Sequence, residues 1–292
     1  MNNIDYVLAS GDSWTAGWME GDDGVARHAD KSVLWPHLLA KKLDVPYVNL
    51  GESAQSNSYI YHSILEHILS NSDQRPLVCC IWTEAFRFTL PIGFRPKVLL
   101  NNGKGYTHRI IKPNCSNHPG LVTTGWWIPG EHQVTGEEWT YVHRDPSSWK
   151  DDRLDFANTY MDKFFNQANL VFQSYLHILS LQEFCKAWCI PFLFLQGMSF
   201  SKSCESLNEQ FLNEFDFDAA LKIMQQIDPS TFLWWNYPKT KESLSSENSF
   251  QDCVTNKNFD IIDKSYHPSK EGHKYLTNLF YQMYEEKYLN GG

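Results

Sequence analysis

Two residues that together could perform nucleophilic catalysis stand at opposite ends of this 292-residue chain. Ser13 ends the tripeptide Gly-Asp-Ser, directly after the short apolar run 7–10, and His267 opens the stretch His-Pro-Ser near the other end. A serine hydroxyl becomes a strong nucleophile only when a base removes its proton, and the pKa of imidazole suits that role near neutral pH. The pair would work only in a fold that brings the two ends of the chain together.

Four blocks of sequence surround these residues in a recognisable order. They are GDS at 11–13, VPYVNLGESA at 45–54, PLVCCIWTE at 76–84 and HPSKEGH at 267–273. In this order they resemble the SGNH hydrolase (GDSL-like esterase/lipase) family, and Trp82-Thr83 with Arg87 resembles the third block of its phage-type members. The resemblance implies a serine esterase with a flavodoxin-like α/β/α fold that needs no metal or organic cofactor.

The resemblance also implies roles for the catalytic residues. Ser13 would be the nucleophile, rather than only an N-cap serine, and His267 the base. His273 is the competing histidine, although its place in the last helix resembles a structural position of the family. The family has an Asp three residues before the histidine, where this chain has Lys264. We therefore expect Asp263 to orient His267, with Asp260 or a backbone carbonyl as the alternatives.

The oxyanion hole departs from the family pattern as well. The Ser13 N–H would be one donor, and the second-block glycine that supplies another is replaced by Ala54, which keeps the N–H. The Asn of the third block is absent, and Thr83 or Glu84 stands in its place. Asn57 is an alternative source of a side-chain amide, and Arg87 joins the expected substrate-binding residues.

The elements that must position these residues alternate between strand and helix. Apolar runs predict strands over 6–10, 47–50, 77–82 and 191–196, with a further short strand over 259–262. Helical spacing predicts helices over 33–43 with Ser32 as N-cap, 58–70, 155–188 as one helix or a pair, 207–227 and 268–286 with Pro268 in the first turn. Residues 14–31 are expected to form an acidic loop that flanks the site. Such alternation predicts a parallel sheet with helices on both faces and a site at the carboxyl ends of the strands.

The length fits a single domain over residues 1–292 that contains one insertion over 92–150. Gly, Pro and Trp crowd the insertion, and no long period survives there. We expect it to lie over the site as a lid or a substrate-binding subregion, with a satellite core as the competing interpretation. Four tryptophans would form the wall of the lid or the satellite core: Trp126, Trp127, Trp139 and Trp149.

Composition restricts the partners and the compartment. A net charge of −9 without a basic patch argues against nucleic acid, and no apolar run is long enough to span a membrane. The first residues lack the pattern of a signal peptide, which favours a cytoplasmic or virion-associated protein. The seven cysteines lack the spacing of a disulfide framework or a metal site, so reduced thiols are expected.

The sequence therefore predicts a serine hydrolase of ester bonds, a carboxylesterase or a carbohydrate O-deacetylase acting on a small ester or an acylated glycan. The alternative is a catalytically degenerate protein of the same fold that serves as a viral structural or glycan-binding component. The missing third-block Asn, the displaced Asp and the many tryptophans motivate that alternative.

Overall fold

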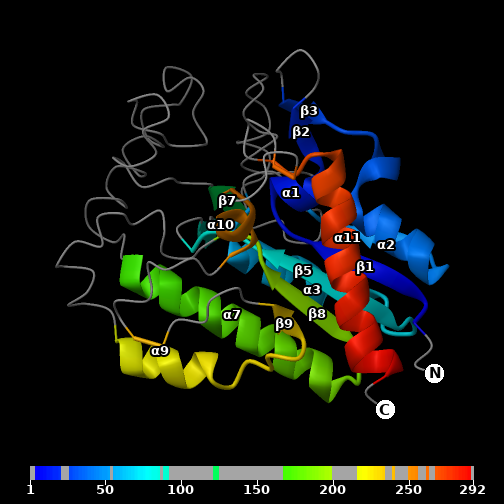
Figure 1. The fold of residues 1–292 in the computed structure, drawn as a ribbon. Helices are drawn as coiled ribbons and strands as arrows, with labels where there is room; N and C mark the ends of the chain where they lie inside the picture. Colours follow the sequence, from blue (N-terminus) through cyan, green and yellow to red (C-terminus); the bar gives the residue numbers. More distant parts are fainter. Residues whose placement is uncertain are drawn as a thin grey trace, which may run out of the picture.

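A five-stranded parallel sheet forms the centre of the computed structural model (Figure 1). The structure describes residues 4–20, 26–52, 55–85, 88–91, 121–124, 167–198, 216–233, 239–240, 249–255, 261–262 and 267–290. The sheet has the order β4-β1-β5-β8-β9, built from Tyr47–Asn49, Tyr6–Ser10, Pro76–Trp82, Phe192–Gln196 and Phe232–Leu233. Numbered along the chain this order is 2-1-3-4-5, the flavodoxin-like arrangement.

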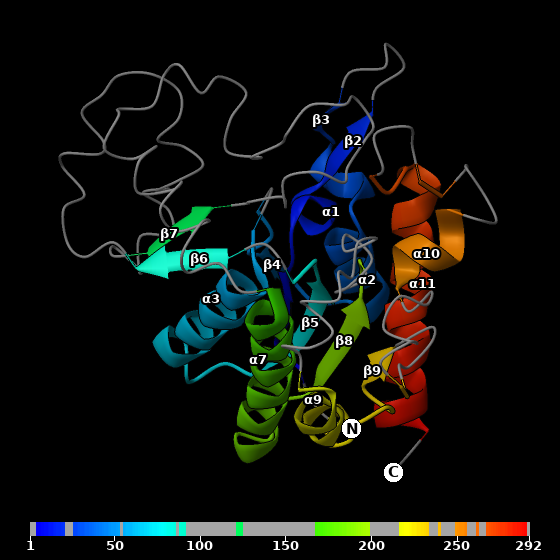
Figure 2. The ribbon, with the colours of Figure 1, turned by 90° about the vertical axis from the view of Figure 1, so that its left-hand side faces the viewer.

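Helices cover both faces of the sheet. α3 (Asn57–Ser70), α7 (Gln167–Ala187) and α9 (Phe217–Met224) lie on one side, and α2 (Trp35–Leu43) and α11 (Lys270–Tyr284) lie on the other (Figure 2). All residues of β5 are buried, because its alternate side chains pack into two separate cores. Val78, Cys80 and Trp82 belong to the core under α3 and α7, and Leu77, Cys79 and Ile81 to the core under α2 and α11. The predicted α/β class with three layers is confirmed.

Most of the predicted elements are present with small shifts of their ends. The expected strands 6–10, 47–50, 77–82 and 191–196 are β1, β4, β5 and β8. The expected helices over 58–70, 155–188 and 207–227 correspond, within the described residues, to α3, α7 and α9. The expected strand over 259–262 is reduced, in its described part, to a single bridge between Ile262 and Pro268.

The prediction of a loop over residues 14–31 is wrong. The chain forms α1 (Ser13–Ala16), an antiparallel hairpin of β2 (Trp18–Glu20) and β3 (Ala26–His28), and a 3-10 turn, η1 (Lys31–Val33). The Asp12 carboxylate accepts the Trp14 N–H and so starts α1, and Gly17 ends the helix with a φ of 91°. The hairpin lies at the same end of the sheet as α1 (Figure 1).

Two predicted helix starts are also wrong. Ser32 does not cap α2, because its own N–H donates to Asp30 Oδ1 within η1, and Leu34 occupies the N-cap position. Pro268 precedes α11 instead of opening it, and the Ser269 side chain caps the helix by accepting the Gly272 N–H at 3.1 Å. After Tyr284 the helix continues as a π-helical turn, η4 (Glu285–Leu289).

Little of the expected insertion lies within the described residues. β6 (Phe88–Pro91) pairs antiparallel with β7 (Leu121–Thr124), and this hairpin stands beside α3 (Figure 2). Trp126, Trp127, Trp139 and Trp149 lie outside the described residues, so the lid and the satellite core stay predictions. On the other side of the sheet, α10 (Phe250–Thr255) packs its Phe250 ring against Trp14. Among the described helices, none has the length and apolar character of a membrane span.

Candidate active site

Ser13 and His267 meet at the carboxyl edge of the sheet. The Ser13 Oγ lies 3.1 Å from the His267 Nε2, within hydrogen-bond distance. Ser13 is the first residue of α1, directly after β1, and His267 stands just before α11, on the side of the sheet that α11 covers. The Ser13 side chain is only 5% exposed, and His267 is partly buried. An imidazole nitrogen at this distance can accept the hydroxyl proton.

The fold explains why the two ends of the chain converge here. β1 lies between β4 and β5, so the chain leaves β1 at the point where the strand order reverses. In open α/β sheets, ligands bind in the crevice outside the strands at this point. Backbone hydrogen bonds between the β1 and β4 segments continue beyond the ends of both strands. The Leu50 N–H donates to the Ala9 carbonyl oxygen at 2.8 Å, and the Glu52 N–H donates to the Gly11 carbonyl oxygen at 3.1 Å.

Asn49, at the end of β4, is a site residue that the sequence alone did not single out. Its Nδ2 donates to the Thr15 carbonyl oxygen at 2.7 Å, and its Oδ1 accepts the Gly51 N–H at 2.9 Å. Gly51 allows this approach, since a Cβ there would stand 2.8 Å from the Ala16 nitrogen. The second block therefore fixes the turn after β4 against α1. Its Asn-Leu-Gly sequence was the available signal.

Asp12 is a second such residue, and it lies at the centre of the site. Its Oδ1 accepts the Trp14 N–H at 3.0 Å, and its Oδ2 accepts the Thr83 hydroxyl at 3.0 Å. The side chain is 1% exposed. The carboxylate thus connects the first turn of α1 with the segment that follows β5.

The side-chain hydroxyl of Thr83 and the side-chain amide of Asn57 both donate hydrogen bonds to other groups of the protein. The Thr83 hydroxyl donates to Asp12, and the Asn57 amide donates to the Thr83 carbonyl oxygen at 3.0 Å and to the Ser174 Oγ at 3.1 Å. The Asn57 Oδ1 accepts the Thr83 N–H at 2.9 Å. Glu84 is buried beside them. For the Ser13 N–H, by contrast, the part of the chain that the structure describes offers no partner.

Three of the predicted site residues lie outside the described residues: Ala54, Arg87 and Asp263. The alternative carboxylate, Asp260, does so too. The second backbone donor and the group that orients His267 therefore stay predictions. His273 is placed: it is fully buried, and its Nδ1 accepts the Trp35 N–H at 3.3 Å, which joins α11 to α2.

Within the described ranges, Cys79, Cys80 and Cys185 are buried free cysteines and Cys189 is an exposed one. No group of three or more His, Cys, Asp or Glu side chains is arranged there to hold a metal ion. Burial raises the pKa of the thiols of Cys79, Cys80 and Cys185 above the usual value, so they remain protonated.

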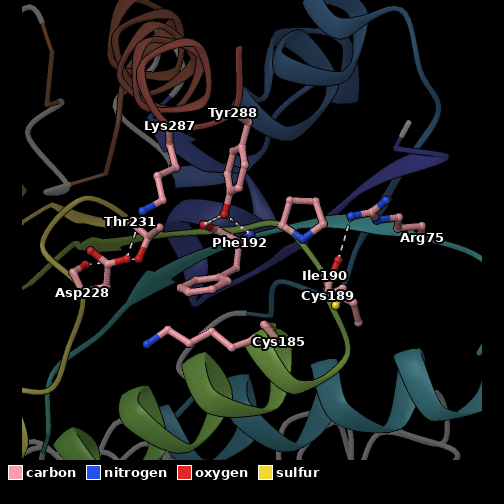
Figure 3. Close-up of a pocket in the computed structure, with 11 residues that line it drawn as sticks. Arg75, Cys185, Cys189, Ile190, Phe192, Asp228, Thr231, Lys287 and Tyr288 are labelled. Atoms are coloured by element: carbon pink, nitrogen blue, oxygen red, sulfur yellow. Dashed lines mark hydrogen bonds and ion pairs between the residues drawn. The ribbon is translucent and has the colours of Figure 1, made fainter. Parts of the chain in front are cut away.

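A cavity of about 300 Å³ lies at the opposite, amino edge of the sheet (Figure 3). Its polar groups pair with one another. Lys287 Nζ lies 3.2 Å from Asp228 Oδ2, the Tyr288 hydroxyl oxygen accepts the Phe192 N–H at 3.0 Å, and Arg75 donates to the Cys189 carbonyl oxygen at 2.9 Å. Ser13 and His267 are not among the lining residues, so the cavity is separate from the candidate site.

No protein-family model and no curated protein matches the chain. Among solved structures, the chain is similar to the psychrotrophic esterase EstA from Pseudoalteromonas sp., with 10% identity, a TM-score of 0.44 and coverage of 98% of this chain and 99% of that one. A putative lipolytic protein of the G-D-S-L family from Desulfitobacterium hafniense is 12% identical, with a TM-score of 0.39 and coverage of 96% and 99%. An acetyl xylan esterase from Geobacillus stearothermophilus is 13% identical, with a TM-score of 0.41 and coverage of 96% and 95%. At such identities, we infer the activity from the chain's own site.

Proposed function

We propose that the chain is a serine hydrolase of ester bonds, with Ser13 as nucleophile and His267 as general base. The observation that carries the proposal is the 3.1 Å separation of Ser13 Oγ and His267 Nε2. A hydroxyl and an imidazole at hydrogen-bond distance, at the carboxyl edge of a parallel sheet, form the reactive part of a serine hydrolase site.

The reaction follows from this geometry. As Ser13 Oγ attacks the ester carbonyl carbon, its proton moves to His267 Nε2, and the carbonyl oxygen becomes an oxyanion. The Ser13 N–H, at the start of α1, would donate to that oxygen. The imidazolium then gives its proton to the departing alcohol, which leaves an acyl group on Ser13. A water molecule, deprotonated by His267, releases the acid and restores the serine.

We further propose that Asp263 orients the base and that the Ala54 N–H is a second oxyanion donor. A carboxylate that accepts the His267 Nδ1–H would hold Nε2 in its unprotonated form and stabilise the imidazolium. Asp260 is the alternative carboxylate. Alanine at position 54 keeps the backbone donor that the family takes from glycine.

We propose a small acyl group on a carbohydrate or another alcohol as the substrate. The hairpin that follows α1, at the same end of the sheet, carries an aromatic pair: the rings of Trp18 and His28 have their centroids 4.9 Å apart. Aromatic faces bind sugar rings and acyl groups through apolar contact. Release of acetate from an acetylated polysaccharide, compared with p-nitrophenyl acetate, would separate a carbohydrate deacetylase from a general carboxylesterase.

Replacement of the nucleophile tests the proposal directly. Ser13→Ala should lower kcat for p-nitrophenyl acetate on the order of 10⁴- to 10⁶-fold, the size of triad knock-outs. Ser70→Ala is the matched control, because Ser70 is exposed at the end of α3, away from the site. A fluorophosphonate probe should label the wild type and the control but not Ser13→Ala. Turnover that survives in Ser13→Ala would refute Ser13 as the nucleophile. A wild type that neither turns over the ester nor reacts with the probe would favour the degenerate glycan-binding alternative.

A further inference from the structure

We propose that Thr83 is a positioning residue: its hydroxyl holds the Asp12 carboxylate, which fixes the first turn of α1 and thereby the side chain and N–H of Ser13. The inference rests on the proposed role of Ser13 as nucleophile. It assigns the third-block position a task other than donation to the oxyanion.

The Asp12 carboxylate accepts a hydrogen bond on each of its two oxygens. One oxygen accepts the Trp14 N–H at 3.0 Å and the other accepts the Thr83 hydroxyl at 3.0 Å. Both side chains are only 1% exposed. A hydrogen bond to a buried carboxylate is strong and geometrically demanding, because water does not compete for the acceptor. The donor at position 83 therefore helps to fix the position of this carboxylate.

The helix α1 is too short to be stable without contacts to the rest of the protein. The helix has four residues, Ser13–Ala16, too few to hold a helical turn through its own backbone hydrogen bonds. Its position depends on its contacts with the neighbouring strands. Asn49 binds the Thr15 carbonyl from the β4 side, and Thr83 binds Asp12 from the β5 side. Loss of either contact removes one of the side-chain hydrogen bonds that hold the Ser13 turn against the sheet.

The backbone of Thr83 is itself held in place. Asn57 accepts the Thr83 N–H at 2.9 Å and donates to the Thr83 carbonyl oxygen at 3.0 Å, so one amide holds both backbone groups of the residue. The same amide donates to Ser174 Oγ on α7. The backbone at position 83 is thus held by α3 and α7, and only the hydroxyl extends toward Asp12.

The consequence for the reaction is a loss of alignment when the hydroxyl is removed. A misplacement of about 1 Å between reacting groups costs about 100-fold in rate. We expect Thr83→Val, which has nearly the same shape but no hydroxyl, to lower kcat about 10- to 100-fold while KM changes about 2-fold or less. Thr83→Ser, which keeps the hydroxyl, should recover most of the wild-type kcat.

Thr231→Val is the matched control. Thr231 is also 1% exposed, and its hydroxyl donates to the Asp228 carbonyl oxygen at 3.1 Å, at the amino edge of the sheet. It should lower Tm about as much as Thr83→Val but leave kcat close to that of the wild type. A loss of kcat in Thr83→Val alone, with recovery in Thr83→Ser, supports the positioning role. Equal kcat in the two valine variants overturns it.

A crystallographic comparison keeps this result separate from the fate of the proposed function. If the wild type shows no hydrolysis that depends on Ser13, the proposed function fails, and the structures of the wild type and Thr83→Val still decide the positioning role. A Ser13 Oγ to His267 Nε2 separation that lengthens in Thr83→Val beyond the wild-type value supports the inference. An unchanged separation and unchanged first turn of α1 overturn it.

Discussion

The contact between α3 and α7 should make the stability of the protein sensitive to acid through His177. The imidazole of His177 packs against the Tyr61 ring at a centroid distance of 5.3 Å and lies 6.4 Å from the His62 ring. Its buried Nδ1 has no hydrogen-bond partner among the residues that the structure describes. Burial, and then the nearby His62, lower the pKa of His177 to about 4. The folded protein therefore holds this imidazole in its neutral form.

The sign and the size of the effect follow from this pKa. Above pH 6.5 the imidazole is neutral in the folded and the unfolded chain, and the contribution to stability is fully present. Between pH 6.5 and about 4 only the unfolded chain binds the proton, so the free energy of unfolding decreases as the pH falls. A pKa lowered from 6.5 to about 4 corresponds to a loss of about 3 kcal/mol, at about 1.4 kcal/mol for each tenfold change in proton affinity.

The assay is urea unfolding of the wild type and of His177→Gln from pH 7.5 to pH 4.5. The variant is expected to lose less stability across this range than the wild type, with the difference growing as the pH falls. Only the pH dependence of the free energy of unfolding is compared, so a change in stability that the substitution causes at every pH does not affect the result. His67→Gln is a useful second variant, because burial lowers the pKa of His67 in the same direction. Parallel curves for the wild type and His177→Gln would refute the reasoning.

Two glycine substitutions test the close approaches that position the catalytic pair. Gly272→Ala would place a Cβ against the Ile261 carbonyl oxygen, so it should destabilise the start of α11 by about 1–3 kcal/mol and lower kcat. Thermal melts would measure the first effect and p-nitrophenyl acetate turnover the second. An unchanged Tm would contradict the close packing at Gly272. Gly51→Ala would place a Cβ 2.7 Å from the Thr15 Cβ, which pushes α1 away from β4, and we expect a similar loss of stability together with slower labelling by a fluorophosphonate. Labelling at the wild-type rate would show that the Ser13 turn does not depend on this contact.

The sequence predicted the long elements and missed the short ones for a physical reason. β1 and β5 are continuous apolar runs because both faces of the sheet are covered, and such runs are visible without any partner. α1 has one turn and β9 has two residues, Phe232–Leu233, so neither is long enough to establish a period. The signals for α1 were single residues at its ends, Asp12 and Gly17, which a search for periodicity does not weigh.

The proximity of Ser13 and His267 was predictable because its signal lies in residue types at the ends of strands. Ser13 and His267 stand in blocks whose order along the chain matches a known pattern, and the 2-1-3-4-5 order of the sheet places such strand ends at one crevice. The hydrogen bonds around them depend instead on register. In β1 and β5, Tyr6 pairs with Pro76 and Ser10 with Cys80. This register brings the residues just beyond the two strands together, so that the Thr83 hydroxyl lies 3.0 Å from the Asp12 Oδ2.

That register also gives Thr83 a contact that differs from the one expected of an Asn in the third block. An asparagine in the third block would present an amide to the oxyanion, whereas the shorter threonine presents a hydroxyl that donates to Asp12. The Ser13 turn is then held from the β5 side by Thr83 and from the β4 side by Asn49. In the proposed mechanism, backbone N–H groups donate to the oxyanion, and we expect such contacts to set their direction. A site of this kind depends more on the geometry of α1 than on any single side-chain donor.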